Sequence, residues 1–263
     1  GDGPMKRTIV ILAAMLALAA RARAQGYVIL MDDRRVDGTS IAARPDGTIV
    51  LTTASGQTLE FDRARVKLAV APRPREYDQA GAAIQAKRYD DAIRLLRDVY
   101  ARNRFFNWGE MASKQIGRVF AEKGDLPEAV KAYEEHLRRY PAAEQDSEWM
   151  WLYLNTLLQA REFAKLEPRL NRMVAEGARR DAARAQILRG DVRAASNQLE
   201  AAALDYLRAV MFYATEKDLV PQAMFKTAAT LDQMRDPRAK EWYRKLVDEF
   251  PASAEATEAK KRL

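Results

Sequence analysis

Residues 110–143 read EMASKQIGRVFAEKGDLPEAVKAYEEHLRRYPAA, and their apolar spacing predicts two short helices folded against each other. Gly124 supplies a stop for the first helix, and Asp125 can cap the start of the second. Pro141 ends the second helix because proline lacks the backbone N–H that a helix interior needs. The stretch therefore predicts a helical hairpin with sharply defined ends.

Small residues fall where these two helices would cross. Gly117 lies in the middle of the first helix, with Phe120 on the same face, and Ala129 lies in the second, with Tyr133 one turn later. Two helices joined by a tight turn approach closely only where their crossing point holds no bulky side chain. The sequence therefore gives Gly117 and Ala129 a packing role.

The pattern of the second helix recurs along the chain. Positions equivalent to Ala129 occur at intervals of 36 or 37 residues, at Ala92, Leu166, Ala202 and Ala239. Five copies in one register indicate a stack of helix pairs. The third copy departs from the pattern, since leucine replaces alanine and Pro168 follows it, so we expect that pair to be splayed or to start late.

A small residue in each helix, an aromatic residue one turn later and a terminal proline resemble the tetratricopeptide repeat (TPR) family. The resemblance covers residues 75–263 and implies a mainly α fold, a TPR-like α-solenoid of antiparallel helix pairs. The repeat interval exceeds the ~34 residues usual in the family, so we expect longer turns between pairs. The expected pairs are 75–87 with 90–102, 107–123 with 126–139, 146–160 with 163–176, 180–196 with 199–214, and 219–234 with 237–249, followed by a capping helix within 252–263.

The same resemblance implies a peptide-binding groove lined by the first helices of successive pairs. On this register the positions expected to face inward are Tyr77, Ile84, Met111, Lys114, Arg118, Trp151, Asn155, Leu158, Arg184, Ile187, Asp191 and Met224. Trp149 and Trp151 are two positions apart, so only one of the two can face the groove. TPR proteins that clamp a C-terminal carboxylate use lysine, arginine and asparagine at set places, and this chain matches that pattern only in part. The residues expected to bind the partner combine cations, an amide and an aromatic ring: Lys114, Arg118, Trp151, Asn155 and Arg184.

The end of the chain carries a second resemblance. Residues 241–263, EWYRKLVDEFPASAEATEAKKRL, are similar to the C-terminal repeats of periplasmic TPR proteins. That group includes the Tol-Pal-associated cell-division coordinator and the lipoprotein component of outer-membrane barrel assembly. The resemblance covers about one repeat and implies a role in the cell envelope.

Residues 25–71 have a different character. Short β-branched runs such as 48–53 (TIVLTT) alternate with Asp-Gly and Ser-Gly turns, a pattern typical of β-hairpins. Four or five strands in this length predict a small all-β, SH3-like module. Residues 72–74, Pro-Arg-Pro, predict a stiff linker to the helical part. The module is either an accessory without a ligand or a binder of peptide or cell wall.

The N-terminal segment has the pattern of a Sec-type signal peptide. Residues 1–4 precede the first methionine and are left out of the fold prediction, together with the predicted signal peptide that ends at residue 24. Lys6 and Arg7 come before the apolar run 8–20, which is shorter than the ~20 residues of a membrane-spanning helix. Small residues at positions 22 and 24 predict cleavage before Gln25 and a periplasmic or secreted protein.

Composition excludes several classes of function. The 263 residues include no cysteine and one histidine, His136, which rules out thiol chemistry and cysteine- or histidine-rich metal sites. We expect that histidine on the surface or in a helix seam. The net charge is +7, of which residues 1–24 carry +3, so nothing demands nucleic acid as a partner. No nucleophile stands beside a base, so we expect neither an enzyme nor a cofactor.

Two hypotheses of function follow. The first is an exported scaffold that binds a protein or peptide in its concave groove, during cell-envelope assembly or division. The alternative is a cell-wall-binding or polysaccharide-export accessory protein that acts through the β module. Association with the envelope or peptidoglycan is expected under both, and the sequence leaves the oligomeric state open.

Overall fold

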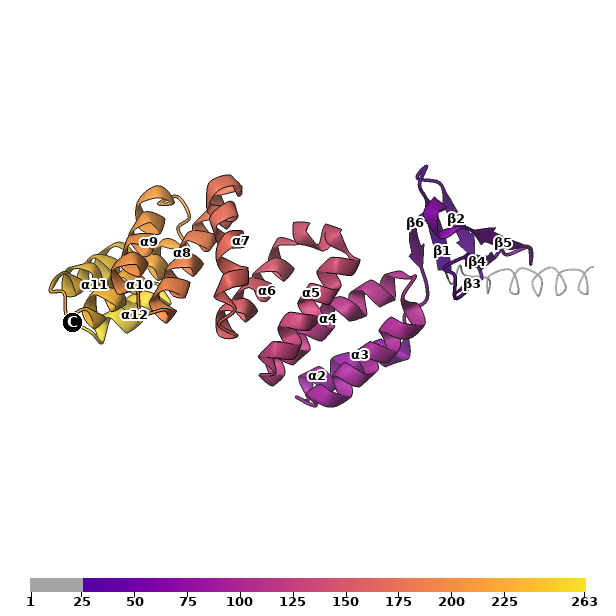
Figure 1. The fold of residues 1–263 in the computed structure, drawn as a ribbon, viewed down its shortest axis with the longest axis horizontal. Coiled ribbons are helices and arrows are strands. Elements are labelled where there is room, and N and C mark those ends of the chain that lie inside the picture. The colour runs from indigo at the N-terminus through magenta and orange to yellow at the C-terminus, as the bar shows by residue number, and fades with distance from the viewer. Residues whose placement is uncertain (1–25) are drawn as a thin grey trace, which may run out of the picture. The chain divides into compact units, whose positions relative to one another are not determined.

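The computed structural model describes residues 26–263, so the predicted signal peptide lies outside the described residues. The fold is mainly α: eleven helices in packed antiparallel pairs follow two small β-sheets within this range (Figure 1). None of these helices is long and apolar enough to cross a membrane. The helices are α2 (Arg75–Gln85), α3 (Tyr89–Asn103), α4 (Asn107–Lys123), α5 (Leu126–Arg139), α6 (Ser147–Gln159), α7 (Phe163–Glu176), α8 (Arg179–Ala195), α9 (Leu199–Phe212), α10 (Val220–Gln233), α11 (Arg238–Glu249) and α12 (Ala254–Lys260).

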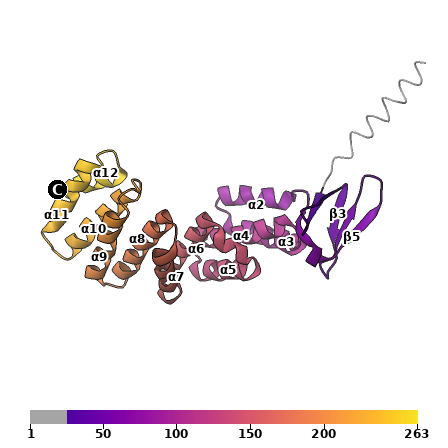
Figure 2. The same cartoon turned by 90° about the horizontal axis from the view of Figure 1, so that it is seen from above.

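The β part holds six strands rather than the expected four or five, because β2 (RVDG) and β3 (SIAA) have only four residues and one β-branched residue each, and so carry little strand signal in the sequence. The strands form two antiparallel sheets, ordered β2-β1-β6 and β3-β4-β5. Figure 2 shows the β part from a second side, with β3 and β5 labelled. Gly38 ends β2 against Leu51, where a Cβ atom would lie 2.5 Å from the leucine Cδ1. The strands are β1 (Gly26–Leu30), β2 (Arg35–Gly38), β3 (Ser40–Ala43), β4 (Ile49–Thr52), β5 (Thr58–Phe61) and β6 (Val66–Val70).

The described residues form two compact units, which divide between Asp146 and Ser147. The first unit joins the β part to helices α2–α5, partly because Trp108 Nε1 donates to the carbonyl of Ala71 at 2.8 Å. Asn107 Oδ1 accepts from the Ala71 N–H at 3.2 Å. These bonds tie the end of β6 to the start of α4. The boundary expected at residues 72–74 stays a prediction about where the β module ends.

The predicted repeat register is confirmed. Ala92, Ala129, Leu166 and Ala202 are fully buried, and Ala239 is 3% exposed. Each begins the buried stripe of the second helix in its pair, which packs on the first helix of the same pair. The third pair departs as expected in one respect: α7 packs less closely on α6 than the second helix of any other pair packs on its first, as in a splayed pair. It starts at Phe163 and so does not start late, and Pro168 lies inside the helix.

Each pair turns through a residue in the left-handed conformation. The five residues are Lys87, Gly124, Arg161, Asn197 and Arg235, with φ between 56° and 88°. In every turn, the residue that follows the left-handed one donates its backbone N–H to the carbonyl of the residue five positions before it. Asp125 N, for example, lies 3.0 Å from Phe120 O. This is the Schellman arrangement, which satisfies carbonyls at a helix end. The turn geometry is therefore as regular as the register.

Candidate partner-binding pocket

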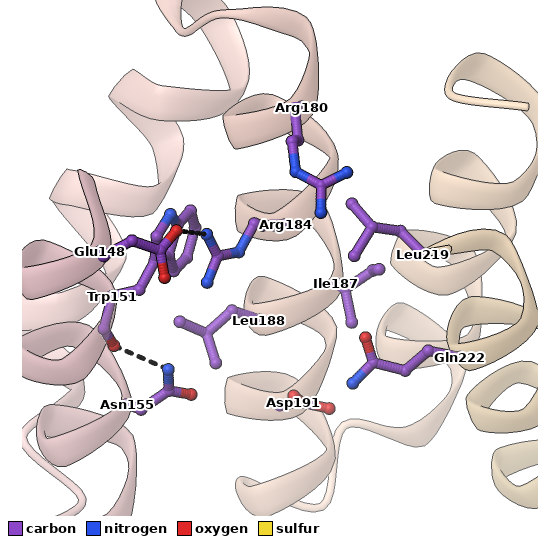
Figure 3. Close-up of a pocket in the computed structure, with 10 residues that line it drawn as sticks. All are labelled: Glu148, Trp151, Asn155, Arg180, Arg184, Ile187, Leu188, Asp191, Leu219 and Gln222. Carbon is purple, nitrogen blue, oxygen red and sulfur yellow. Dashed lines mark hydrogen bonds and ion pairs between the residues drawn. The ribbon is translucent and has the colours of Figure 1, made fainter. Parts of the chain in front are cut away.

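A pocket of about 350 Å³ lies on the first helices of three successive pairs in the second unit. Helices α6, α8 and α10 supply its walls (Figure 3). Ile187 and Leu188 of α8 and Leu219, just before α10, provide the apolar surface. The remaining lining residues are polar, charged or aromatic: Glu148, Trp151, Asn155, Arg180, Arg184, Asp191 and Gln222.

Arg184 and Trp151 form the most specific feature of the pocket. The guanidinium carbon lies 4.3 Å from the centre of the indole ring, within the range of a cation–π contact. Arg184 also pairs with Glu148 at 3.2 Å, but that carboxylate side chain is 84% exposed. The indole N–H donates to Asp181 Oδ1 at 3.1 Å, which fixes the plane of the ring. The ring therefore holds the guanidinium, while its carboxylate partner stays open to water.

Asn155 lies one turn beyond Trp151 on α6. Its Nδ2 donates to the Trp151 carbonyl at 2.7 Å, so the amide oxygen is oriented away from the helix (Figure 3). Gln222 faces the pocket from α10. Two side-chain amides on opposite walls can accept from and donate to the backbone of an extended peptide.

The two ends of the pocket are held by ion pairs. At one end Arg180 donates to Asp218 at 2.8 Å, and this hydrogen bond holds the pKa of the Asp218 carboxyl below its ordinary value. At the other end Asp191 accepts from Tyr206 at 2.7 Å and from Lys226 at 2.6 Å. Burial, followed by the Asp191 charge, raises the pKa of the Tyr206 hydroxyl. The walls are thus ordered before any ligand binds.

The structure brings together three of the five predicted site residues, Trp151, Asn155 and Arg184. Lys114 and Arg118 belong to α4 in the other unit and do not line this pocket. Lys114 pairs with Asp146, and Arg118 pairs with Glu122 one turn along its own helix at 2.7 Å. Whether any of the five binds a partner stays a prediction.

Of the other positions expected to face inward, Ile187 and Asp191 also line the pocket. Trp149 and Trp151 are both buried, and only Trp151 lines the pocket, while Trp149 stacks on Tyr153. Met224, expected to face inward, is fully buried among residues of α11 and α12. The capping helix covers that position, so the sequence missed Leu219 and Gln222 as the lining of the last pair. Pro221 marks the start of α10, but nothing in the sequence indicated that this helix end faces Arg180 and Arg184.

His136 is buried in the first unit, at 1% exposure, and so belongs to a helix seam. Its Nδ1 lies 3.0 Å from Ser113 Oγ. Burial lowers the pKa of the imidazole to about 4, and the charge of Lys114 acts in the same direction, against that of Asp146. No cluster of three or more metal-ligating side chains occurs within residues 26–263.

Comparison with known proteins gives similarity of fold. No family model matches the sequence, and no curated protein matches it. Among solved structures, residues 41 to the end of MamA from Desulfovibrio magneticus RS-1 align with a TM-score of 0.51 and 18% identity, covering 68% of this chain and 95% of that one. A double mutant of the RS-1 MamA gives 0.51 and 18%, covering 66% and 91%. YrrB, a TPR protein with an unusual peptide-binding site, gives 0.47 and 17%, covering 71% and 90%.

Proposed function

We propose that this protein is an exported TPR-like scaffold that binds a protein or peptide segment in the pocket of α6, α8 and α10. The observation that carries the proposal is the pocket itself, which combines an apolar surface with oriented amides and a guanidinium held on an indole ring. Such a mixture of aromatic, arginine and aliphatic groups is characteristic of interface centres.

The geometry favours binding over proton transfer. Asp191 already accepts two hydrogen bonds, and Glu148 is an exposed carboxylate with an arginine beside it. The pocket therefore offers shape, charge and hydrogen-bond partners rather than a group poised to react.

We further propose that the protein acts in the cell envelope, in assembly or division. The signal-like residues 5–24 and the resemblance of residues 241–263 support this part of the proposal. In a Gram-negative host, the exported form should begin at Gln25, as read by mass spectrometry of the periplasmic fraction. A Leu16→Arg variant, which interrupts the apolar run, should accumulate uncleaved. Recovery of uncleaved wild-type protein with the cytoplasm would contradict export.

Crosslinking tests the pocket directly. A photoreactive amino acid at position 222 of the full chain should capture a partner in the native host, and the same group at the exposed Lys240, on α11, should not. Arg184→Glu should reduce capture at least about tenfold, since it reverses the charge beside Trp151. Equal capture by wild type and Arg184→Glu would remove the pocket from the proposal.

A further inference from the structure

Two grooves in this chain occupy equivalent positions, two repeats apart, and differ in what fills them. The first is a cavity between α3 and α5 on the surface of α4, and the second is the equivalent position between α7 and α9 on the surface of α8. A shift of 73 residues relates them, as it relates Gly117 to Gly190 and Tyr133 to Tyr206. In both grooves a glycine of the first helix faces the tyrosine ring of the second.

The groove on α8 is filled by the chain's own charged side chains. Asp205 is fully buried and pairs with Arg189 at 2.9 Å and with Arg193 at 2.7 Å. Gln186 Nε2 donates to the same carboxylate at 2.6 Å, and Arg208 pairs with it at 3.2 Å. The second unit therefore closes this groove with a hydrogen-bonded ionic cluster.

The groove on α4 has apolar residues where the other has that cluster. Ile116, Phe120 and Ala132 stand in the places of Arg189, Arg193 and Asp205. None of the three can fill the space with a long polar side chain, and a cavity of about 280 Å³ remains above them. Tyr100 of α3 and Ser113 of α4 also line it. Glu128 and Lys131 of α5 line it as well, and they pair with each other at 3.4 Å.

The rims of this cavity carry two opposite charges, Arg97 and Glu135, that form no ion pair within the described residues. Arg97 on α3 lies over the Phe120 ring at 5.5 Å, and Glu135 on α5 is exposed on the opposite rim. Neither forms an ion pair with another residue of the described range 26–263. In the filled groove, the position of Glu135 is taken by Arg208, which does form one. An ionic rim above an apolar floor is thus available to a ligand.

We propose that the cavity on α4 is a second docking site and that it binds a protein segment with one large apolar side chain between an acidic and a basic residue. The apolar side chain occupies the space above Ile116 and Phe120, where it loses contact with water. The acidic residue pairs with Arg97 and the basic residue with Glu135, which fixes the direction of the segment across α4. This site belongs to the first unit and does not depend on the pocket of α6, α8 and α10.

A random peptide library displayed on phage and selected on the full-length mature chain tests the inference. The selected peptides should share a large apolar residue flanked by opposite charges and should bind with a dissociation constant below about 100 µM. Binding should move the ring resonances of His136, because Ser113 joins that ring to the cavity lining. Failure to select such peptides would overturn the proposal.

Two variants and one control locate the binding. Ala132→Trp fills the cavity from its half-buried edge and should weaken the selected peptides about tenfold or more. Arg97→Glu, at an exposed position that leaves the core intact, should weaken them several-fold and favour peptides with the charge order reversed. Arg184→Glu, in the other pocket, should leave their binding unchanged.

The control separates this inference from the proposed function. Peptides that lose binding on Arg184→Glu but not on Ala132→Trp would overturn the second site and would support the pocket of α6, α8 and α10. If circular dichroism shows that Ala132→Trp lowers the helical content, the test of the cavity on α4 depends on Arg97→Glu instead. Peptides indifferent to that charge reversal would then overturn the proposal.

Discussion

Gly190 and Gly117 control how closely the helices of their pairs approach. A Cβ atom on Gly190 would lie 2.4 Å from a Tyr206 ring carbon, and one on Gly117 would lie 3.0 Å from the Tyr133 ring. The residue that faces each glycine is therefore the aromatic one, rather than the small residue one turn earlier. Because both tyrosines are buried, their rings have little room to move.

We expect Gly190→Ala to lower the free energy of unfolding by about 2 kcal/mol or more, because the ring must shift or the helices must separate. Gly117→Ala should cost less, since its contact is longer. Gly81→Ala is the matched control: nothing lies within 4 Å of its Cβ position, and it should raise stability by about 0.5–1 kcal/mol. Urea denaturation of the three variants measures the order, and equal costs at positions 190 and 81 would contradict the packing account.

His136 makes stability depend on pH in a defined window. Its folded-state pKa of about 4 lies below the ordinary value of 6.5, so the unfolded chain takes up the proton first as pH falls. The stability that the folded state gains from a neutral His136 is fully present above pH 6.5 and is lost progressively as pH falls toward 4. The loss should amount to roughly 2–3 kcal/mol, measured by urea denaturation across this range.

The single histidine makes this prediction easy to check. His136→Gln removes the titrating group and should abolish this part of the loss between pH 6.5 and 4, leaving only the dependence due to carboxyl groups such as Asp218. The proton resonances of the imidazole in the folded protein report its pKa directly, without interference from other histidines. A midpoint near 6.5 in the folded state would show that burial does not exclude the charged form.

At the scale of helices and turns, the sequence predicted the pairs because burial enforces a period. Ala92 and its four equivalents must be small or fit a fixed gap, so they keep a visible register. The turns within the pairs were visible only at Gly124. Lys87, Arg161, Asn197 and Arg235 adopt the same left-handed conformation, and its cost of about 1–2 kcal/mol per residue is offset by the Schellman hydrogen bonds.

That cost gives a prediction for the turn between α2 and α3. Lys87→Gly removes the steric strain of a φ of 56° and should raise stability by about 0.5–1 kcal/mol, after the entropy of the added glycine is counted. Ala82→Gly, at an exposed position inside α2, should lower stability by about 1 kcal/mol. Thermal and urea unfolding compare the two variants, and a loss of stability at both positions would argue against the strain.

The candidate site was partly visible for the same reason. Trp151, Asn155 and Arg184 follow from the spacing of first helices, which the register fixes. Met224 was wrongly expected to line the groove, because α12 packs over it and only the folded chain shows this contact. The cavity on α4 was also hidden, since its emptiness emerges only when Ile116 and Phe120 are compared with Arg189 and Arg193 in space.

At the scale of the whole molecule, the described chain has more than one core. The second unit contains two clusters of its own, one around Met224 and Tyr243 and one around Ile187 and Tyr206. In repeat proteins each pair contacts chiefly its neighbours, so stability is close to a sum of local terms. The second unit, residues 147–263, therefore has the buried surface that an independent fold requires.

We expect a fragment of residues 147–263 to fold alone, with the helical circular dichroism of α6–α12 and a cooperative thermal transition. Gly190→Ala should lower the fragment's free energy of unfolding by the same amount, within about 0.5 kcal/mol, as it lowers that of the matching transition in the full chain. The agreement is expected because Tyr206, the residue that the new methyl group would meet, lies inside the fragment. Lys87 lies in a turn outside the fragment, so Lys87→Gly should not change the transition of the full chain that matches the fragment. A fragment without a cooperative transition would show that the second unit needs the first in order to fold.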